Sequence, residues 1–240
     1  MVEAAATFRK SGFNDSDAAT LAKVAAMYQN VSDTAVSAED AAASIVSQIR
    51  AFGKNADFAT TIIDVYNEVA NNFSTGTNDI ANAMEIAGAG LSTYNNSFQE
   101  VVGLVTAGSE IFVGRSSQVA RGLSTIASNT AKAGDALAKY HIDVKNADGT
   151  MRSTYDILKD VSKIWKDLDD SQRQALGETL SGGVNQYKVL AAIMANFQTA
   201  IDATATAYDS AGSAAEENAK YMEHLEAQIN NLKGDRKSVV

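Results

Sequence analysis

The complete absence of proline is the feature of this sequence that most restricts its fold. The chain has 240 residues, and average proline usage would place roughly a dozen prolines in such a chain. Proline interrupts an α-helix more strongly than any other residue, because it lacks a backbone N–H and clashes with the preceding turn. Alanine, the best helix former, is abundant. The sequence therefore predicts an all-α fold.

Apolar residues recur at steps of three and four along most of the chain, which is the pattern of amphipathic helices. Ser97 and Glu100 predict a capping box, Ser153 predicts another helix start, and Gly182 and Gly183 predict a helix end. The helices expected from this pattern cover residues 15–30, 37–52, 58–73, 80–91, 98–105, 119–127 with a weaker continuation to 140, 154–168 and 170–181.

One segment, residues 142–152, is typical of a β-hairpin. Alternating residues flank Asp148-Gly149, and an Asp-Gly pair between such runs is a strong hairpin signal. We expect a small two-stranded β-ribbon here, packed against neighbouring helices because it would be marginally stable alone.

The last quarter of the chain carries an unbroken heptad pattern from residue 187 to residue 232. A repeat held this long is typical of a coiled coil, and a continuous helix over it would be roughly 70 Å long. Gly212 and the run of alanines are its weak points, where the helix could bend or the seam thin out. Asn218 occupies a core position, where one polar residue can fix register and oligomer state. The predicted coiled-coil seam is formed by Tyr187, Leu190, Met194, Phe197, Ile201, Tyr208, Asn218, Met222, Leu225, Ile229 and Leu232.

These patterns divide the chain into three expected regions. Residues 1–140 form a helical-hairpin region, residues 141–183 contain the β-ribbon and its helices, and residues 184–236 form a long helix or coiled coil.

Composition and motifs argue against an enzyme. The net charge of −9 disfavours a direct nucleic-acid site, and the longest apolar run, 189–195, is far too short to span a membrane. The two histidines, His141 and His224, are 83 residues apart and form no metal or catalytic motif. We interpret the acidic residues Asp167, Asp169 and Asp170 as helix-capping residues. No catalytic residue, metal site or cofactor is expected.

The order of these segments resembles the core region of tail tape measure proteins from long-tailed phages and prophages of Gram-positive bacteria. The first two helices, residues 12–33 and 37–53, resemble the beginning of that region, and residues 138–153 carry the most specific stretch. This chain has His141 and Ser181 where the family usually has glycine and alanine. The remaining matching segments are 156–158, 165–168, 180–183 and 189–190.

The resemblance implies a structural protein without enzymatic activity. Such a protein acts as a helical ruler and scaffold for tail tube assembly and takes part in genome ejection. Its implied partners are tail tube proteins, tail assembly chaperones and further copies of itself, paired through the coiled coil. It would reside in the lumen of the virion tail, and in the host bacterial cytoplasm during assembly. Because family members are far longer, the chain looks like a fragment.

A second interpretation stays open, in which the chain is a helical-bundle binding or surface module of bacterial or prophage origin. It predicts a compact monomer in which residues 187–232 fold back on the earlier helices. The sequence leaves open the host and phage, the number of copies, whether the chain is compact or extended, and whether lytic or membrane segments exist elsewhere.

Overall fold

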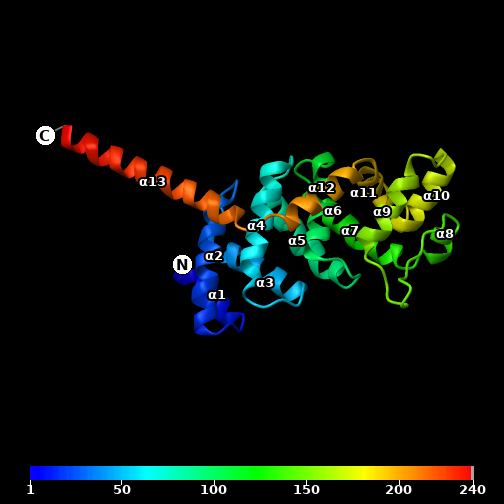
Figure 1. Ribbon diagram of the computed structural model, residues 1–240, viewed down its shortest axis with the longest axis horizontal. Coiled ribbons are helices and arrows are strands. Elements are labelled where there is room, and N and C mark those ends of the chain that lie inside the picture. The colour runs from blue at the N-terminus through cyan, green and yellow to red at the C-terminus, as the bar shows by residue number, and fades with distance from the viewer. Residues whose placement is uncertain (239–240) are drawn as a thin grey trace.

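The computed structural model (Figure 1) describes the backbone of residues 1–238 and the side chains of residues 1–229. Within residues 1–238 the chain is all-α, as the composition predicts, and no β-sheet forms there. Its helices are α1 (Val2–Lys10), α2 (Asp15–Val31), α3 (Ala38–Ala51), α4 (Phe58–Asn72), α5 (Thr77–Ser92), α6 (Phe98–Ile111), α7 (Ser116–Thr130), α8 (Gly134–Ala138), α9 (Thr154–Trp165), α10 (Asp170–Ser181), α11 (Val184–Ala195), α12 (Phe197–Tyr208) and α13 (Ser213–Ser238).

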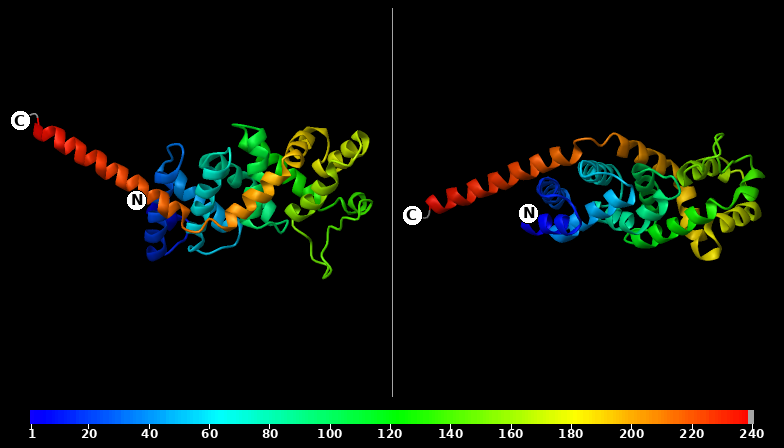
Figure 2. Two further views of the ribbon diagram at one scale, coloured as in Figure 1. Left: turned by 45° about the horizontal axis from the view of Figure 1, so that its top comes forward. Right: turned by 90° about the horizontal axis from the view of Figure 1, so that it is seen from below.

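The helices build an elongated body with a projecting C-terminal helix (Figure 1). Helices α1 to α3 lie at one end of the body, and α8 to α10 lie at the other. Helices α11 and α12 run back along the body toward the first end, where α13 leaves it near the N-terminus (Figure 2). The N-terminus and the start of α13 therefore lie at the same end of the body.

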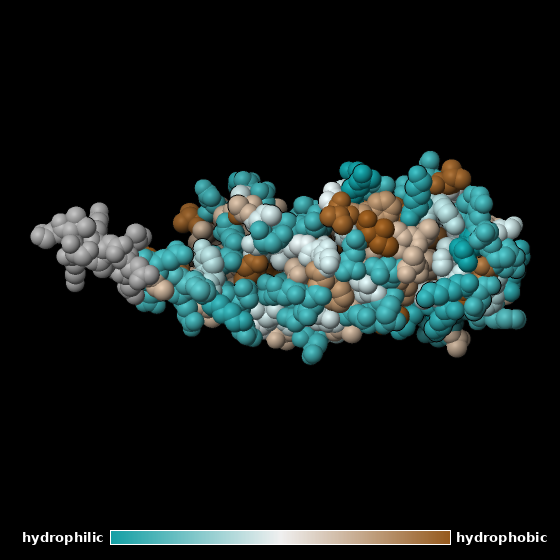
Figure 3. Space-filling model, turned by 90° about the horizontal axis from the view of Figure 1, so that it is seen from above, coloured by the Kyte–Doolittle hydropathy of each residue, from teal (hydrophilic) through white to brown (hydrophobic). Residues whose placement is uncertain are grey.

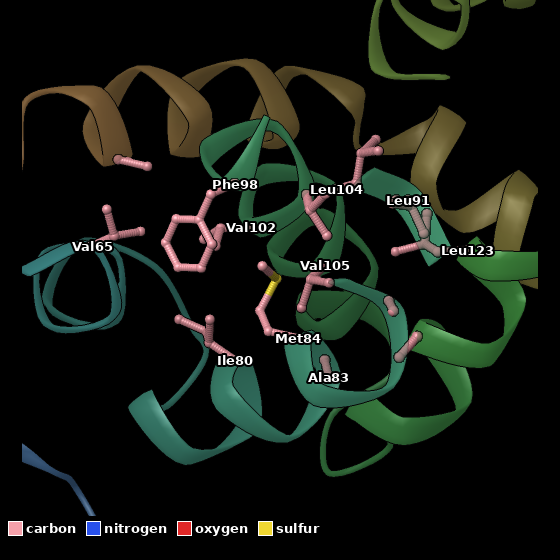
Figure 4. Close-up of a cluster of buried hydrophobic side chains, with 14 of the residues drawn as sticks. Val65, Ile80, Ala83, Met84, Leu91, Phe98, Val102, Leu104, Val105 and Leu123 are labelled. Carbon is pink, nitrogen blue, oxygen red and sulfur yellow. The ribbon is translucent and has the colours of Figure 1, made fainter. Parts of the chain in front are cut away.

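Helix α6 lies at the centre of the body. Every residue from Val101 to Ser109 is buried, because α5, α7 and α12 all pack against this helix. In Figure 4, Phe98 and Val105 of α6 meet Met84 of α5 within the cluster of apolar side chains. One cluster of buried residues runs from Ala4 to Ala214, so all three regions expected from the sequence contribute side chains to it.

The caps expected from the sequence are present. Ser97 accepts a hydrogen bond from the Glu100 amide, and the Glu100 carboxylate accepts one from the Ser97 amide, which completes the capping box of α6. The Ser153 hydroxyl caps α9 by accepting a hydrogen bond from the Asp156 amide, without a reciprocal bond. Gly182 ends α10 with φ of 73°, a left-handed conformation that favours glycine.

The expected β-ribbon at residues 142–152 is wrong. A single antiparallel bridge joins Lys145 and Met151, supported by hydrogen bonds from Asn146 to Thr150 and from Arg152 to Val144. The Asp-Gly turn does form, but residues 145–150 are exposed. Only Ile142 is buried, so the segment lacks an apolar face on which a longer ladder would pack.

The expected continuous helix over residues 187–232 is also wrong, because two breaks divide it into α11, α12 and α13. The first break is Asn196, whose side-chain amide donates to the Ala107 carbonyl and the Glu110 carboxylate at the end of α6. The second break ends at Gly212, with φ of 88°. Both breaks let the chain follow the surface of the body instead of leaving it as one rod.

Candidate functional site: the C-terminal helix and its anchor

The predicted seam residues are distributed over three helices. Tyr187, Leu190 and Met194 lie on α11, and Phe197, Ile201 and Tyr208 lie on α12. Asn218, Met222, Leu225, Ile229 and Leu232 lie on α13. Leu232 lies outside the residues whose side chains the structure describes.

Part of the first half of the seam packs inside the chain, whereas Tyr208 at the end of α12 is 61% exposed. Leu190, Met194 and Phe197 are buried, and the ring of Phe197 lies 5.9 Å from that of Tyr155 on α9. Helix α12 lies so close to α6 that a Cβ on Gly103 would stand 2.6 Å from the Ala200 carbonyl oxygen. These residues therefore form the core of the protein's own fold.

The base of α13 is fixed to α4 by a buried carboxylate. Asp64 is buried, and its two carboxylate oxygens accept hydrogen bonds from the backbone amides of Gly212 and Ala214, each at 3.0 Å. The first amides of a helix have no partner within the helix. Asp64, from a distant part of the chain, supplies the hydrogen-bond acceptors for these amides. Its negative charge also complements the positive end of the helix dipole.

Three further polar contacts hold the same end of α13. Buried Asn67 donates to the Ser213 hydroxyl at 2.9 Å, and that hydroxyl donates to Glu68 at 2.6 Å. One turn further along, Asn30 of α2 donates to Asn218 at 2.8 Å. Within the described part of α13, only Ala214 belongs to the cluster of buried apolar residues that forms the core. The anchor is therefore mainly polar.

Beyond the anchor, α13 carries an exposed apolar stripe formed by Tyr221, Met222, Leu225 and Ile229. Their side chains are 44%, 49%, 39% and 42% exposed, respectively. The spacing of three and four residues places Met222, Leu225 and Ile229 on the face that Asn218 begins. Figures 1 and 2 show α13 leaving the body along this part of its length. An apolar stripe exposed on a projecting helix is typical of a surface that pairs with another helix.

The remaining candidate residues have structural roles. Asp169 caps α10 through the amide of Gln172, as the capping interpretation predicts. Asp170 lies in the first turn of α10 and forms an ion pair with Arg173 at 3.3 Å. His141 and His224 are exposed and lie on separate elements. Trp165 is buried.

The partly buried carboxylate of Glu100 also serves the fold. Burial raises the pKa of Glu100, while the Ser97 amide opposes this by hydrogen bonding. This carboxylate completes the cap of α6, which explains its burial.

Among the described residues, no group of three or more His, Asp or Glu side chains is arranged to hold a metal ion. No helix within residues 1–238 is both long and apolar enough to cross a bilayer.

Sequence reasoning missed the anchor. Asp64, Asn67 and Glu68 interrupt a run of apolar and small residues on α4, and a buried acidic position in such a helix signals a hydrogen-bond partner elsewhere. The partner lies 148 residues away at Gly212, so the sequence pattern alone does not indicate it.

Comparison with known proteins identifies the family. The model of the family described as phage-related minor tail protein matches residues 1–182. The chain belongs to this family. Its matched range ends at the turn between α10 and α11, so the returning helices and α13 lie outside it. Membership in the minor tail protein family means a structural role in a phage tail and fits a protein of the virion tail. No solved structure gives a significant match to the chain.

Proposed function

We propose that the chain is a segment of a tape measure protein, which acts as a helical ruler and scaffold during tail tube assembly and takes part in genome ejection. Membership in the minor tail protein family supports the tail role. The observation that carries the finer proposal is α13, a helix anchored at its base whose exposed apolar stripe extends away from the body.

A helix suits a ruler because its length is fixed by its residue number, at about 1.5 Å per residue. The polar anchor holds the first turn of α13 against α4 and α2. Residues added to α13 beyond this point therefore extend the helix from a base whose position on the body is fixed.

The stripe on α13 supports pairing with further copies of the chain as a coiled coil. Tyr221, Met222, Leu225 and Ile229 form the pairing surface, because the earlier seam residues Leu190, Met194 and Phe197 are buried in the body. Asn218 contacts Asn30 of its own chain and marks where pairing would begin. Tail tube proteins and tail assembly chaperones are the other proposed partners, in the tail lumen and, during assembly, in the host cytoplasm.

Location in the tail is tested with a phage or prophage that encodes this chain. An epitope tag inserted at the exposed turn Asp148-Gly149 is detected by immunogold electron microscopy on intact tails and on tails opened by mild denaturant. Labelling of opened tails alone supports a position in the lumen. Labelling of intact tails along their outer surface would contradict it.

A second candidate function is a compact helical binding module. The folding of α11 and α12 along the body, with Leu190 and Phe197 in the core, is an observation that favours it. Light scattering on the purified chain distinguishes the two, because the binding module is a monomer of 25.3 kDa and the tape measure segment forms oligomers.

A further inference from the structure

A pocket opens where the end of α3 and the start of α4 meet the end of α5 and the start of α6. Its volume is about 540 Å³, within the range of about 300–1,000 Å³ that is usual for ligand pockets. It is lined by Arg50, Ala51, Phe52, Gly53, Lys54, Phe58, Ser92, Asn96, Ser97, Phe98 and Gln99.

Three phenylalanine rings form the apolar part of this pocket. The centroid of the buried Phe98 ring lies 5.4 Å from that of Phe52 and 5.3 Å from that of Phe58. Both contacts are edge-to-face, with interplanar angles of 88° and 82°. Phe52 and Phe58 are only half-buried and line the pocket. A further aromatic ring can pack against them, because aromatic side chains favour edge-to-face and offset contacts with one another.

Two basic side chains stand beside these rings. Arg50 and Lys54 are exposed, and the Lys54 Nζ lies 5.8 Å from the centroid of the Phe58 ring. Gly53, with φ of 60°, turns the chain after α3, and the Lys54 amide then donates to the Ile49 carbonyl at 2.8 Å. This bond is typical of a helix C-terminal motif, so the end of α3 holds Lys54 next to the aromatic rings.

Neither cation is neutralised by the chain itself. Arg50 and Lys54 form no ion pair within residues 1–229, and Arg50 donates to the uncharged carbonyl of Ser11. None of the lining residues is acidic, and the nearby Asp57 accepts from Asn55 outside the lining. In a chain of net charge −9, this is a local positive surface, which favours an anionic partner.

The polar groups between the rings and the cations are engaged within the fold. Ser92 donates to the Ala51 carbonyl. The side-chain oxygen of Asn96 accepts from the Tyr155 amide, and the Ser97 hydroxyl belongs to the cap of α6. The groups left for a ligand are therefore chiefly the aromatic rings and the two cations.

We propose that this pocket binds an acidic segment of a partner protein, which inserts an aromatic side chain between flanking carboxylates. The ring packs on Phe52 and Phe58, and the carboxylates pair with Arg50 and Lys54, since guanidinium and ammonium groups form charge-assisted hydrogen bonds with carboxylates. A small inorganic anion would leave the rings uncovered. The net charge of −9 disfavours a nucleic acid. The proposal goes beyond the ruler function, because the pocket shares no residue with α13.

The test uses the full chain and three acetylated pentapeptide amides, followed by the backbone amide signals of Gly53, Phe58 and Gln99 in NMR spectra. The peptide Glu-Glu-Phe-Glu-Glu is expected to shift these signals with saturation. Gln-Gln-Phe-Gln-Gln, which lacks the carboxylates, and Glu-Glu-Ala-Glu-Glu, which lacks the ring, are each expected to bind about tenfold more weakly or not at all. Equal binding of either analogue would overturn the proposal, as would the absence of binding by the first peptide.

Variants separate the pocket from general attraction to basic residues. Lys54→Gln is expected to weaken binding of the first peptide about fivefold. Lys23→Gln removes an exposed positive charge on α2 that does not line the pocket and is expected to leave binding unchanged. Both substitutions are at exposed sites, so the fold is kept. Equal weakening by the two variants would contradict a defined pocket.

Two further measurements test the class of partner. Displacement of the peptide by a single-stranded oligonucleotide that binds more tightly would assign the pocket to nucleic acid and overturn the proposal. Shifts of the same amide signals with chain concentration, in the absence of peptide, would assign it to a second copy of the chain and equally overturn it. The proposal predicts that neither is observed.

Discussion

The carboxylate of Asp64 on α4 accepts a hydrogen bond from the backbone amide of Ala214 at 3.0 Å, across 150 positions of sequence. Asp64 also accepts a hydrogen bond from the Gly212 amide. This one side chain therefore caps α13, a helix that is far from α4 in the sequence. The direction in which α13 leaves the body therefore depends on a residue in the middle of another helix.

Replacing Asp64 with asparagine is expected to loosen the base of α13. The amide keeps the size of the side chain but has one acceptor oxygen, so one of the two backbone amides loses its partner. Loss of a buried hydrogen bond to a charged group costs about 1–3 kcal/mol. Hydrogen exchange of residues 213–218 measures the effect as faster exchange in Asp64→Asn.

Asp57→Asn is the matched control, since Asp57 is exposed and makes no capping bond at the start of the same helix. Exchange at residues 213–218 is expected to stay unchanged in this variant. Equal exchange rates in Asp64→Asn and the parent chain would contradict the anchor.

The close contact between α6 and α12 predicts a strong effect of adding one methyl group. In Gly103→Ala the new Cβ would collide with the Thr204 hydroxyl and the Ala200 carbonyl oxygen, and overpacking of this kind costs about 1–3 kcal/mol. Gly90→Ala makes the same change in α5, where the nearest atom is 3.6 Å away. The free energy of unfolding of Gly90→Ala is expected to rise by up to about 1 kcal/mol, because alanine has a higher helix propensity than glycine. Urea denaturation of both variants measures the contrast, and equal effects would contradict the packing.

Glu85 predicts a dependence of stability on pH. Burial raises the pKa of Glu85, the Ser44 hydroxyl lowers it, and the charge of Asp40 raises it. An acid whose pKa is higher in the folded state binds its proton more tightly there. Its stabilising contribution is therefore complete below the unfolded pKa, about 4.3 for glutamate, and is lost as the pH rises through the folded pKa.

Glu85→Gln removes this titration. The free energy of unfolding of the parent chain, relative to that of Glu85→Gln, is expected to fall as the pH rises from about 4 to 7. Urea denaturation across that range measures it, with Glu39→Gln as the control for the loss of one negative charge. A constant or rising difference would show that the folded state does not raise the pKa of this carboxyl.

The proposed self-association is expected to depend on the α13 stripe. In Leu225→Asp and Ile229→Asp a charge replaces an exposed apolar side chain, so pairing is lost while the body, to which neither residue belongs, stays folded. Val113→Asp makes the same kind of change at a 76% exposed site outside the stripe and is expected to keep the oligomer. Light scattering and circular dichroism together measure mass and fold. An oligomer that survives both α13 variants would contradict pairing through the stripe.

Local signals in the sequence predicted the parts of the fold that depend on neighbouring residues. The Ser97–Glu100 capping box and the Gly182 helix end were predictable because their partners lie within five residues. The seam spacing on α13 was predictable for the same reason. These features follow from helix periodicity and capping chemistry alone.

Features that depend on distant partners were not predictable. Asn196 continues the helical pattern, and its break arises from bonds to Ala107 and Glu110 on α6. Leu190 and Phe197 fit a coiled-coil seam and a core equally well, because both environments select the same side chains. Asp64 carried no local signal for Gly212. Of the candidate site, Met222, Leu225 and Ile229 were named from their spacing, Tyr221 and the anchor were not, and pairing through the stripe stays a prediction.

The most direct test of the ruler function is tail length in a series of phages with a lengthened α13. One, two and four copies of the heptad 222–228 are inserted after Gln228, which keeps the stripe in register. The ruler predicts that each copy lengthens the tail by about 10 Å, whereas four copies placed in the exposed turn at 148–149 leave it unchanged. Tails of constant length, in particles shown to contain the lengthened chain, would contradict it.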